Sequence, residues 1–332
     1  MSENVRKLAL SEHKRTRELY ESVFPEDSTS FVDYYYQEKV IDNSIYVIEE
    51  DNRIVSMIHL NPYEAMIGGV PCTIHYIVAV ATAKEYRHRG YMRRLLETVM
   101  ADLRREGELI TYLMPVAEGI YSPYEFYTVY RKKWEYLSRE TARTEGYEAL
   151  TDKEIPTLVE QANTYFKEHY QVYTVRSERY YQRLLKEYAS DGGKLLVKKA
   201  DGKILKGGIL LAGEGFKETV IMIRILDVKR LLSLLKLKSL VALCFEVVDN
   251  DIKENNLCLT ITGTEYSGCM LMESPRENRE GVIPIGALCG FVFGALSVSE
   301  LAKQEGVSLS ERLKGELEKI VPLKEIMLDE VV

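Results

Sequence analysis

The chain has 332 residues, of which 46% are hydrophobic and 29% charged, an ordinary globular composition that excludes an intrinsically disordered protein. Its 44 lysines and arginines stand against 51 aspartates and glutamates, and the net charge of −7 argues against a general nucleic-acid-binding protein. At roughly 150 residues per domain the length suggests about two domains, and the acidic balance mildly favours a basic small molecule as partner.

Cysteine usage and the N-terminus predict a cytoplasmic protein. The cysteines are odd in number and none are spaced as C-x-x-C, so neither a disulfide framework nor a zinc site is expected, and we expect no metal. The first residues lack the apolar core of a secretory signal. The five cysteines are Cys72, Cys244, Cys258, Cys269 and Cys289.

The longest apolar stretch, residues 283–296, is too short to cross a bilayer, which needs about 18 such residues. Its glycines at positions 286, 290 and 294 resemble the spacing of a membrane helix dimer. A buried helix packed closely against a neighbouring element explains the same spacing better, and we expect no membrane span.

The first 138 residues predict a mixed α/β unit, because helical and strand periodicities alternate along them. Turns are expected at Asp51-Asn52 and at Gly68-Gly69, and Gly107 ends a helix. The expected helices cover residues 11–27, 30–39, 90–105 and a short segment near 121–127. The expected strands cover residues 44–50, 53–60, 72–82, 109–114 and 129–137.

The charged run at residues 138–145 predicts a linker to a second region. Within the last hundred residues Ser297 and Glu300 form the pattern of a capping box, and Gly306 stands where a helix C-cap glycine belongs. After the linker we expect helices over residues 152–169 and 177–188 and strands over 194–199, 204–212 and 219–226, followed by a third unit of helices and strands.

Residues 77–92 carry the strongest chemical signal, a strand followed by a basic turn and the start of a helix. Backbone N–H groups at a helix N-terminus point toward a bound anion, and the helix dipole favours its charge. Gly90 permits close backbone approach, while Arg87, His88 and Arg89 add positive charge. Six arginines between residues 87 and 105 face two carboxylates, so this stretch carries +4 in an acidic protein.

The same segment resembles motif A of the GNAT acetyltransferases, a strand followed by [RQ]-x-x-G-x-[GA]. Arg87, Gly90 and Met92 occupy the three pattern positions, and Met92 departs from the small residue usual there. The resemblance implies acetyl-CoA as co-substrate, its pantetheine arm on the backbone of Val80 and Thr82 and its pyrophosphate on residues 87–92. The implied cofactor-binding set is Val78, Val80, Thr82, Arg87, His88, Arg89, Gly90, Tyr91 and Met92.

Further patches resemble the Eis (enhanced intracellular survival) branch of the GNAT proteins. Residues 118–121, Glu-Gly-Ile-Tyr, with Tyr124 and Phe126 are similar to its motif B, while residues 224–229 and 293–302 resemble its closing sterol-carrier-protein-like domain. This resemblance implies an α/β (α+β) protein that assembles as a hexamer. The implied domains are a GNAT domain at 1–138, a truncated GNAT-like middle region at 139–221 and a sterol-carrier-protein-like domain at 222–332.

Acetyl transfer from a thioester to an amine requires alignment, removal of an amine proton and protonation of the departing thiolate. Tyr121 is the candidate acid, since a phenol with an ordinary pKa of about 10 can share a proton with a thiol. No histidine stands in a recognisable motif for the base. In the Eis branch the C-terminal carboxylate enters the active site, which here implies Val332, and such a weak base needs desolvation or a mediating water.

The acceptor wall implied by the resemblance comprises Glu26, Asp27, Phe31 and Tyr35, where carboxylates and aromatic faces would suit a polyamine-like or aminoglycoside-like cation. Glu26 and Asp27 could equally end one helix and cap the next. The leading function is an acetyl-CoA-dependent N-acetyltransferase acting on a small cationic amine. The alternatives are a non-catalytic acyl-CoA sensor or lipid carrier, and a protein-lysine acetyltransferase.

Overall fold

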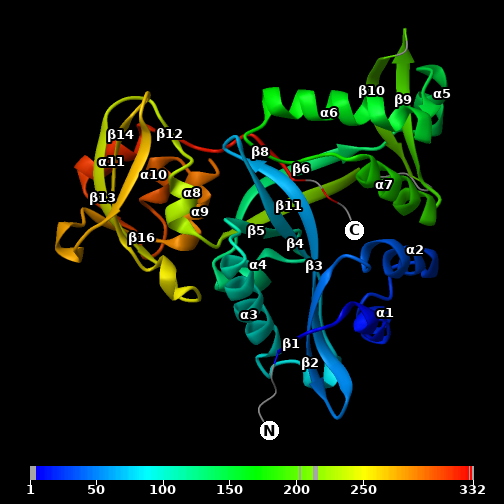
Figure 1. The fold of residues 1–332 in the computed structure, drawn as a ribbon, viewed down its shortest axis with the longest axis horizontal. Helices are drawn as coiled ribbons and strands as arrows, with labels where there is room; N and C mark the ends of the chain where they lie inside the picture. Colours follow the sequence, from blue (N-terminus) through cyan, green and yellow to red (C-terminus); the bar gives the residue numbers. More distant parts are fainter. Residues whose placement is uncertain (1–4, 202, 212–215, 329, 331–332) are drawn as a thin grey trace.

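In a computed structural model that describes residues 5–201, 203–211, 216–328 and 330, the chain is organised around one mixed β-sheet (Figure 1). The main path of this sheet runs β1-β2-β3-β4-β5-β11-β6, and β8 and β19 extend it from β3. Its strands are β1 (Arg6–Lys7), β2 (Ser44–Glu50), β3 (Arg53–Ile67), β4 (Val70–Thr82), β5 (Ile110–Leu113), β6 (Tyr127–Glu135), β8 (Val172–Thr174), β11 (Phe216–Ile225) and β19 (Ile326–Met327). The α/β fold class expected from the sequence is confirmed.

Helices cover both faces of this sheet. Neighbouring side chains of β3 point to opposite faces, so Ile58 packs in the core under α3 (Tyr91–Arg105) while Met57 packs with α1 (Arg17–Val23) and α2 (Thr29–Tyr34). The expected first helix begins as a 3-10 turn, Leu10–Thr16, and the second ends in a π turn, Tyr35–Lys39. The expected short helix near residues 121–127 lies earlier, as α4 (Glu118–Tyr121).

The strand β3 is longer than expected and changes partner along one edge. β2 pairs with it as far as Leu60, and β8 pairs with it from Ala65 onward. Between these two residues no described strand lies beside β3 on that edge. Its other edge stays paired with β4 throughout this stretch, Asn61 opposite Tyr76 and Pro62 opposite His75. The gap leaves one side of residues 61–64 open to side chains from elsewhere.

The region between β6 and β11 is inserted into this sheet. β11 pairs antiparallel with both β5 and β6, so about 80 residues of chain separate β6 from its neighbour β11. Of the described strands between them, β8 alone joins the central sheet. The inserted elements are α5 (Arg139–Thr144), β7 (Glu148–Ala149), α6 (Ile155–His169), β8, α7 (Glu178–Ser190), β9 (Lys194–Ala200) and β10 (Lys203–Leu210), with β10-β9-β7 forming a small sheet.

The linker expected in this region is corrected. The run at residues 138–145 is a helix rather than a linker, because the Ser138 side chain caps it by accepting a hydrogen bond from the Thr141 amide. The expected boundary between residues 221 and 222 falls inside β11, where Met222 and Ile223 pair with β5 and β6. Residues 222–225 therefore belong to the central sheet, and the division of the chain into three domains stays a prediction.

The last hundred residues build a second sheet, ordered β15-β14-β13-β16-β17, to the side of the first (Figure 1). Its strands are β13 (Val241–Val248), β14 (Cys258–Thr264), β15 (Gly268–Glu273), β16 (Gly281–Pro284) and β17 (Ser308–Leu309). Around it lie α8 (Val228–Leu232), α9 (Ile285–Val292), α10 (Val298–Leu301), α11 (Glu311–Leu317) and the pair β12 (Lys236–Leu237) and β18 (Ile320–Val321).

The apolar stretch forms the buried helix α9, as expected. A Cβ at Gly290 would come within 2.7 Å of the Tyr127 ring, so this glycine lets the helix pack against β6. The capping box of Ser297 and Glu300 is confirmed, whereas α10 ends at Leu301 and Gly306 follows in a separate turn. Among the described residues no helix is long and apolar enough to cross a membrane.

Candidate functional site

One edge of the strand β4, the edge that faces β5, is paired along only part of its length. It pairs with β5 only at Tyr76 and Ile77, so from Val78 to Thr82 this edge has no described strand beside it. A bulge at Ala79 and Val80 interrupts the pairing with β3 at the same place, and Ala79 takes a φ of 50°. The backbone of Val80 and Thr82 therefore borders an opening between β4 and β5, where an extended ligand could add hydrogen bonds.

The turn from β4 into α3 lies at the end of this opening. Gly90 caps α3 with a φ of 77°, and a Cβ there would meet no protein atom within 4 Å. Arg87, His88 and Arg89 are exposed around the turn, and the Arg87 Nε donates to the Thr82 carbonyl oxygen (3.1 Å). The free amides of a 15-residue helix, an open glycine and exposed cations together suit a phosphate ligand.

Two residues of the expected cofactor set point away from the turn. The Tyr91 side chain is buried and its hydroxyl donates to Glu50, so only its backbone amide is available to an anion. The half-buried Met92 packs against the core beneath α3. Since neither side chain fills the space over the turn, the larger residue at position 92 does not obstruct it.

Tyr121 ends α4, which follows β5 just beyond the opening. Its ring is half-buried and meets the Phe126 ring edge-on at 6.0 Å. Within the described residues the Tyr121 hydroxyl has no hydrogen-bond partner. Burial, with a smaller contribution from Tyr124, raises the pKa of Tyr121 to about 12, so the phenol stays protonated at neutral pH.

Comparison with known proteins agrees with this geometry. Residues 4–129 match the family model described as an acetyltransferase (GNAT) domain. The chain carries a GNAT acetyltransferase domain. It is therefore an acyltransferase, and residues 4–129 are called the GNAT domain below. None of the curated protein sequences matches the chain significantly.

Solved structures share the whole fold at low identity. A conserved protein from Enterococcus faecalis described as a probable N-acyltransferase superposes with a TM-score of 0.78 at 15% identity, covering 98% of this chain and 99% of that one. A GCN5-related N-acetyltransferase from Anabaena variabilis gives 0.76 at 14% identity, covering 98% of each chain. Eis1 from Mycobacterium abscessus gives 0.70 at 10% identity, again covering 98% of each. At these identities the likeness establishes the fold alone.

A row of side chains crosses the central sheet beside the opening of the GNAT domain. Asn61 of β3 pairs with Tyr76 of β4, which pairs with Tyr112 of β5, so the three side chains share one face. This face is the one that α2 covers. His59, two residues before Asn61, points to the same face, and its Nδ1 forms a hydrogen bond with the hydroxyl of Tyr35 just after α2 (2.9 Å). The rings of Tyr76 and Tyr112 stack at 5.1 Å.

The end of the chain reaches the same face. β19 pairs in parallel with β8, and the buried Glu330 follows it. Its carboxylate accepts hydrogen bonds from Tyr112 (2.9 Å), from Thr174 and from Arg176 (2.6 Å). Val332, the expected base, lies outside the described residues, but Glu330 brings the chain to the tyrosine row.

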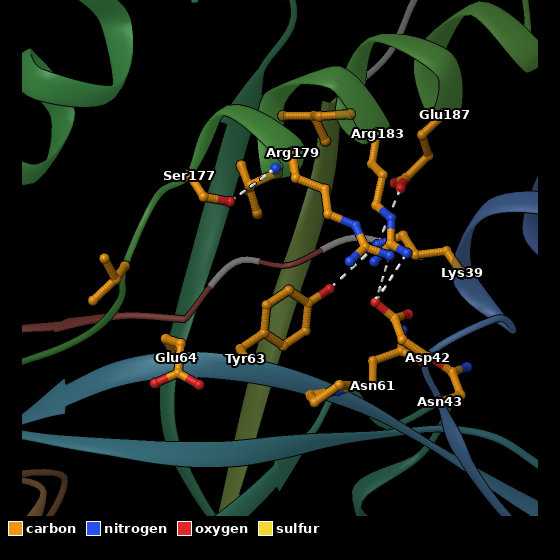
Figure 2. A pocket seen from close by; sticks show the side chains of 14 residues that line it. Lys39, Asp42, Asn43, Asn61, Tyr63, Glu64, Ser177, Arg179, Arg183 and Glu187 are labelled. Carbon is orange, nitrogen blue, oxygen red and sulfur yellow. Dashed lines mark hydrogen bonds and ion pairs between the residues drawn. The ribbon is translucent and has the colours of Figure 1, made fainter. Parts of the chain in front are cut away.

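A pocket of about 360 Å³ lies on this face where β3 has no neighbour (Figure 2). Residues 61–64 of β3, the turn after α2, and α7 form its walls. Its charged lining residues are Lys39, Asp42, Glu64, Arg179, Arg183 and Glu187. The volume falls in the range of small-molecule sites, about 300–1,000 Å³.

The acceptor wall expected from the sequence is largely closed. Tyr35 is completely buried and Phe31 is nearly so, because both rings pack into the aromatic core with Tyr20 and leave no surface for a ligand. Asp27 accepts a hydrogen bond from the Tyr20 hydroxyl (2.8 Å), and Glu26 is exposed. Neither carboxylate lines the pocket.

The sequence pattern missed Asn61, Tyr112 and Glu330. Each acquires its place only through pairing between segments far apart in the chain, as with Glu330 and Tyr112, 218 positions apart. One sequence signal was available. A polar asparagine stands at position 61, before Pro62, at a buried position of a largely apolar strand.

Proposed function

We propose that the protein is an acetyl-CoA-dependent N-acetyltransferase that acetylates a primary amine of a small acceptor. The free edge of β4 beyond its bulge carries this proposal, because it opens beside both the turn at Gly90 and Tyr121. The backbone of Val80 and Thr82 would pair with the pantetheine arm of acetyl-CoA. The amides at the start of α3, together with Arg87, His88 and Arg89, would hold its pyrophosphate.

When bound, acetyl-CoA supplies the thioester. The neutral amine nitrogen attacks the thioester carbonyl carbon, a C–N bond forms and the C–S bond breaks. The departing thiolate takes a proton from the Tyr121 hydroxyl, and the proton lost by the amine returns to bulk water or to Tyr121. We propose that the carboxylate of Val332, reached along the chain from Glu330, receives that amine proton first.

Several finer assignments stay predictions. They are the Eis-type membership, the sterol-carrier-protein-like character of the last hundred residues, the hexamer and the cytoplasmic location. A polyamine-like or aminoglycoside-like acceptor rests on Glu26 and Asp27, which lie outside the pocket.

The first test is thiol release from acetyl-CoA with a panel of amino acids, polyamines, aminoglycosides and lysine peptides. Turnover with a small amine supports the proposal, and turnover with peptides alone would replace it by a protein-lysine acetyltransferase. Tight acetyl-CoA binding with no thiol release across the panel would contradict it and favour an acyl-CoA sensor.

The turn at Gly90 provides a second test. Gly90→Ala should raise the KM for acetyl-CoA roughly 10- to 100-fold, the equivalent of losing one hydrogen bond to a charged group, because the new Cβ enters the space kept for the pyrophosphate. Gly146→Ala is the matched control, since Gly146 has a φ of 74° and equally open surroundings but lies in the inserted region. Both variants bear the same backbone strain, so an equal KM for the two would refute the assignment.

A further inference from the structure

In the pocket, buried polar atoms of Asn61 and Asp42 lack hydrogen-bond partners within the described chain. Asn61 is only 2% exposed, and neither its Nδ2 nor its Oδ1 makes a hydrogen bond within the described chain. The Oδ1 of Asp42 is buried and likewise lacks a hydrogen-bond partner there. Leaving such a group unpaired costs folding stability. Both residues line the pocket, Asn61 from β3 and Asp42 from the turn after α2 (Figure 2).

The pocket also carries an excess positive charge at its α7 wall. Arg179 and Arg183 lie one helical turn apart, a spacing at which like charges repel. Both guanidinium groups approach the same oxygen, the Oδ2 of Asp42, at 3.0 Å (Figure 2). One carboxylate thus serves two arginines, which leaves a charge of +1 and most of their N–H donors available for a ligand.

The other charged lining residues are Lys39, Glu187 and Glu64, and with them the formal charge of the lining sums to zero. The Nζ of Lys39 lies 3.4 Å from Glu187 and donates to the Tyr63 hydroxyl (3.2 Å). Glu64 sits at the exposed rim, where it accepts a hydrogen bond from Thr73. The pocket therefore lacks the negative excess that a polycationic amine would require, and it has room for one anionic group at Arg179 and Arg183.

The pocket is close to the opening of the GNAT domain. Asn61 stands opposite Tyr76, and Tyr76 borders the point where β4 and β5 part. Neighbouring strands lie about 4.8 Å apart, so one strand separates Asn61 from the opening. The pKa of Tyr76 is raised by burial first, and then by Tyr63 of the pocket and by Tyr121 beyond the opening. A small acceptor could therefore span from α7 to the thioester.

We propose that this pocket binds the acceptor through a carboxylate, so that the acetylated amine belongs to an amino-acid-like molecule. Arg179 and Arg183 bind the carboxylate in the fork geometry that guanidinium groups favour. Asn61 offers a donor and an acceptor to the polar groups beside the amine. A monoanion matches the local excess of +1 at Arg179, Arg183 and Asp42, whereas a phosphate dianion would leave a negative charge uncompensated there. This inference rests on the proposed N-acetyltransferase function and narrows its substrate class.

The acceptor class is tested with matched sets of amines. Lysine, ornithine and phenylalanine are each assayed beside their carboxamides and their decarboxylated amines, together with spermidine, kanamycin and phosphoethanolamine. We expect kcat/KM for at least one free acid to exceed that of its amide at least tenfold. Arg183→Gln and Arg179→Gln should each reduce this preference at least fivefold without changing the KM for acetyl-CoA. Lys186→Gln, on the same helix and paired with Glu38 outside the pocket, should leave it unchanged.

Asn61→Leu separates a ligand-binding role from a structural one. It replaces an unpaired buried amide by an apolar side chain of similar size, so the free protein should melt at the same or a higher temperature. Its KM for the acid should rise at least tenfold. A lower melting temperature with unchanged KM would show that Asn61 serves the fold and would remove it from the site.

The outcomes separate this inference from the proposed function. Turnover of amides, polyamines or phosphoethanolamine at least equal to that of every free acid, and insensitive to Arg183→Gln, would overturn the carboxylate inference and leave the N-acetyltransferase standing. Absence of thiol release with every amine would overturn the proposed function. In that event calorimetry with the same three amino acids decides the inference. Binding lost in the Arg179→Gln/Arg183→Gln variant supports it, and no binding to the wild type refutes it.

Discussion

The Tyr121→Phe variant is expected to lose about 10²- to 10⁴-fold in kcat, the contribution of one positioned acid or base. The Tyr121 hydroxyl has no hydrogen-bond partner in the described protein, so its removal leaves no protein group unpaired. The ring and its edge contact with Phe126 stay, and stability and acetyl-CoA binding should change little. The measurement is single-turnover acetyl transfer at saturating acetyl-CoA and acceptor, beside the dissociation constant of acetyl-CoA.

Tyr124→Phe is the matched control for this variant. Tyr124 lies three residues away, and its ring stacks on the Arg93 guanidinium at 4.9 Å, a contact that phenylalanine retains. We expect less than a threefold change in kcat for Tyr124→Phe. If both variants kept wild-type kcat, protonation of the thiolate by Tyr121 would be refuted, and the leaving thiolate would have to take its proton from solvent.

The dependence of kcat on pH is an independent test of Tyr121 as the acid. Burial raises the pKa of Tyr121 to about 12, so the proton that it donates is present at every pH below about 11. The wild-type kcat should therefore show no alkaline decline from this acid between pH 7 and 10. A decline with a midpoint near 9 that disappears in Tyr121→Phe would contradict the buried, protonated phenol.

The sequence predicted well those features that depend on near neighbours in the chain. The helix α3, the turn at Gly90, the strand β2 and the capping box at Ser297 all lie where the local pattern indicated. Periodicity, glycine φ preferences and capping act over a few residues, and a single sequence displays them directly. The site beside β4 could be predicted for the same reason, because the motif that marks it is one continuous segment, residues 77–92.

Features built from distant segments could not be predicted in the same way. The strand β11 has the pattern of any buried strand, and nothing local shows that it returns to lie between β5 and β6. Tyr35 was expected to offer an aromatic face to the acceptor. In the structure it is completely buried, because it hydrogen-bonds to His59 and packs against Tyr20. The pocket joins β3 to α7 across more than 100 residues, so its arginines had no sequence signal linking them to the site.

Loss of the Glu330 carboxylate is expected to have the largest effect on stability. Its ion pair with Arg176 is almost fully buried, with side-chain exposures of 0% and 4%. Removing one partner of such a pair leaves an uncompensated charge, at a cost of about 3–5 kcal/mol in the free energy of unfolding. Tyr112 and Thr174 would lose their acceptor as well. Glu330→Leu should therefore lower the urea midpoint strongly, whereas Glu273→Gln, in an exposed ion pair with Lys229, should cost less than about 1 kcal/mol.

The double variant Arg176→Met/Glu330→Leu shows whether the loss of stability in Glu330→Leu comes from the unpaired Arg176 charge or from lost packing around residue 330. With both charges gone no buried ion remains, so the double variant should be more stable than Glu330→Leu alone, short of wild type by the unpaired Tyr112 and Thr174 hydroxyls. A double variant as unstable as the single one would show that packing of the chain end, rather than the ion pair, holds it against β5. Acetyl transfer by the double variant then tests whether Glu330 itself is needed for turnover. If kcat recovers with stability, the Glu330 carboxylate takes no part in turnover and serves the fold alone.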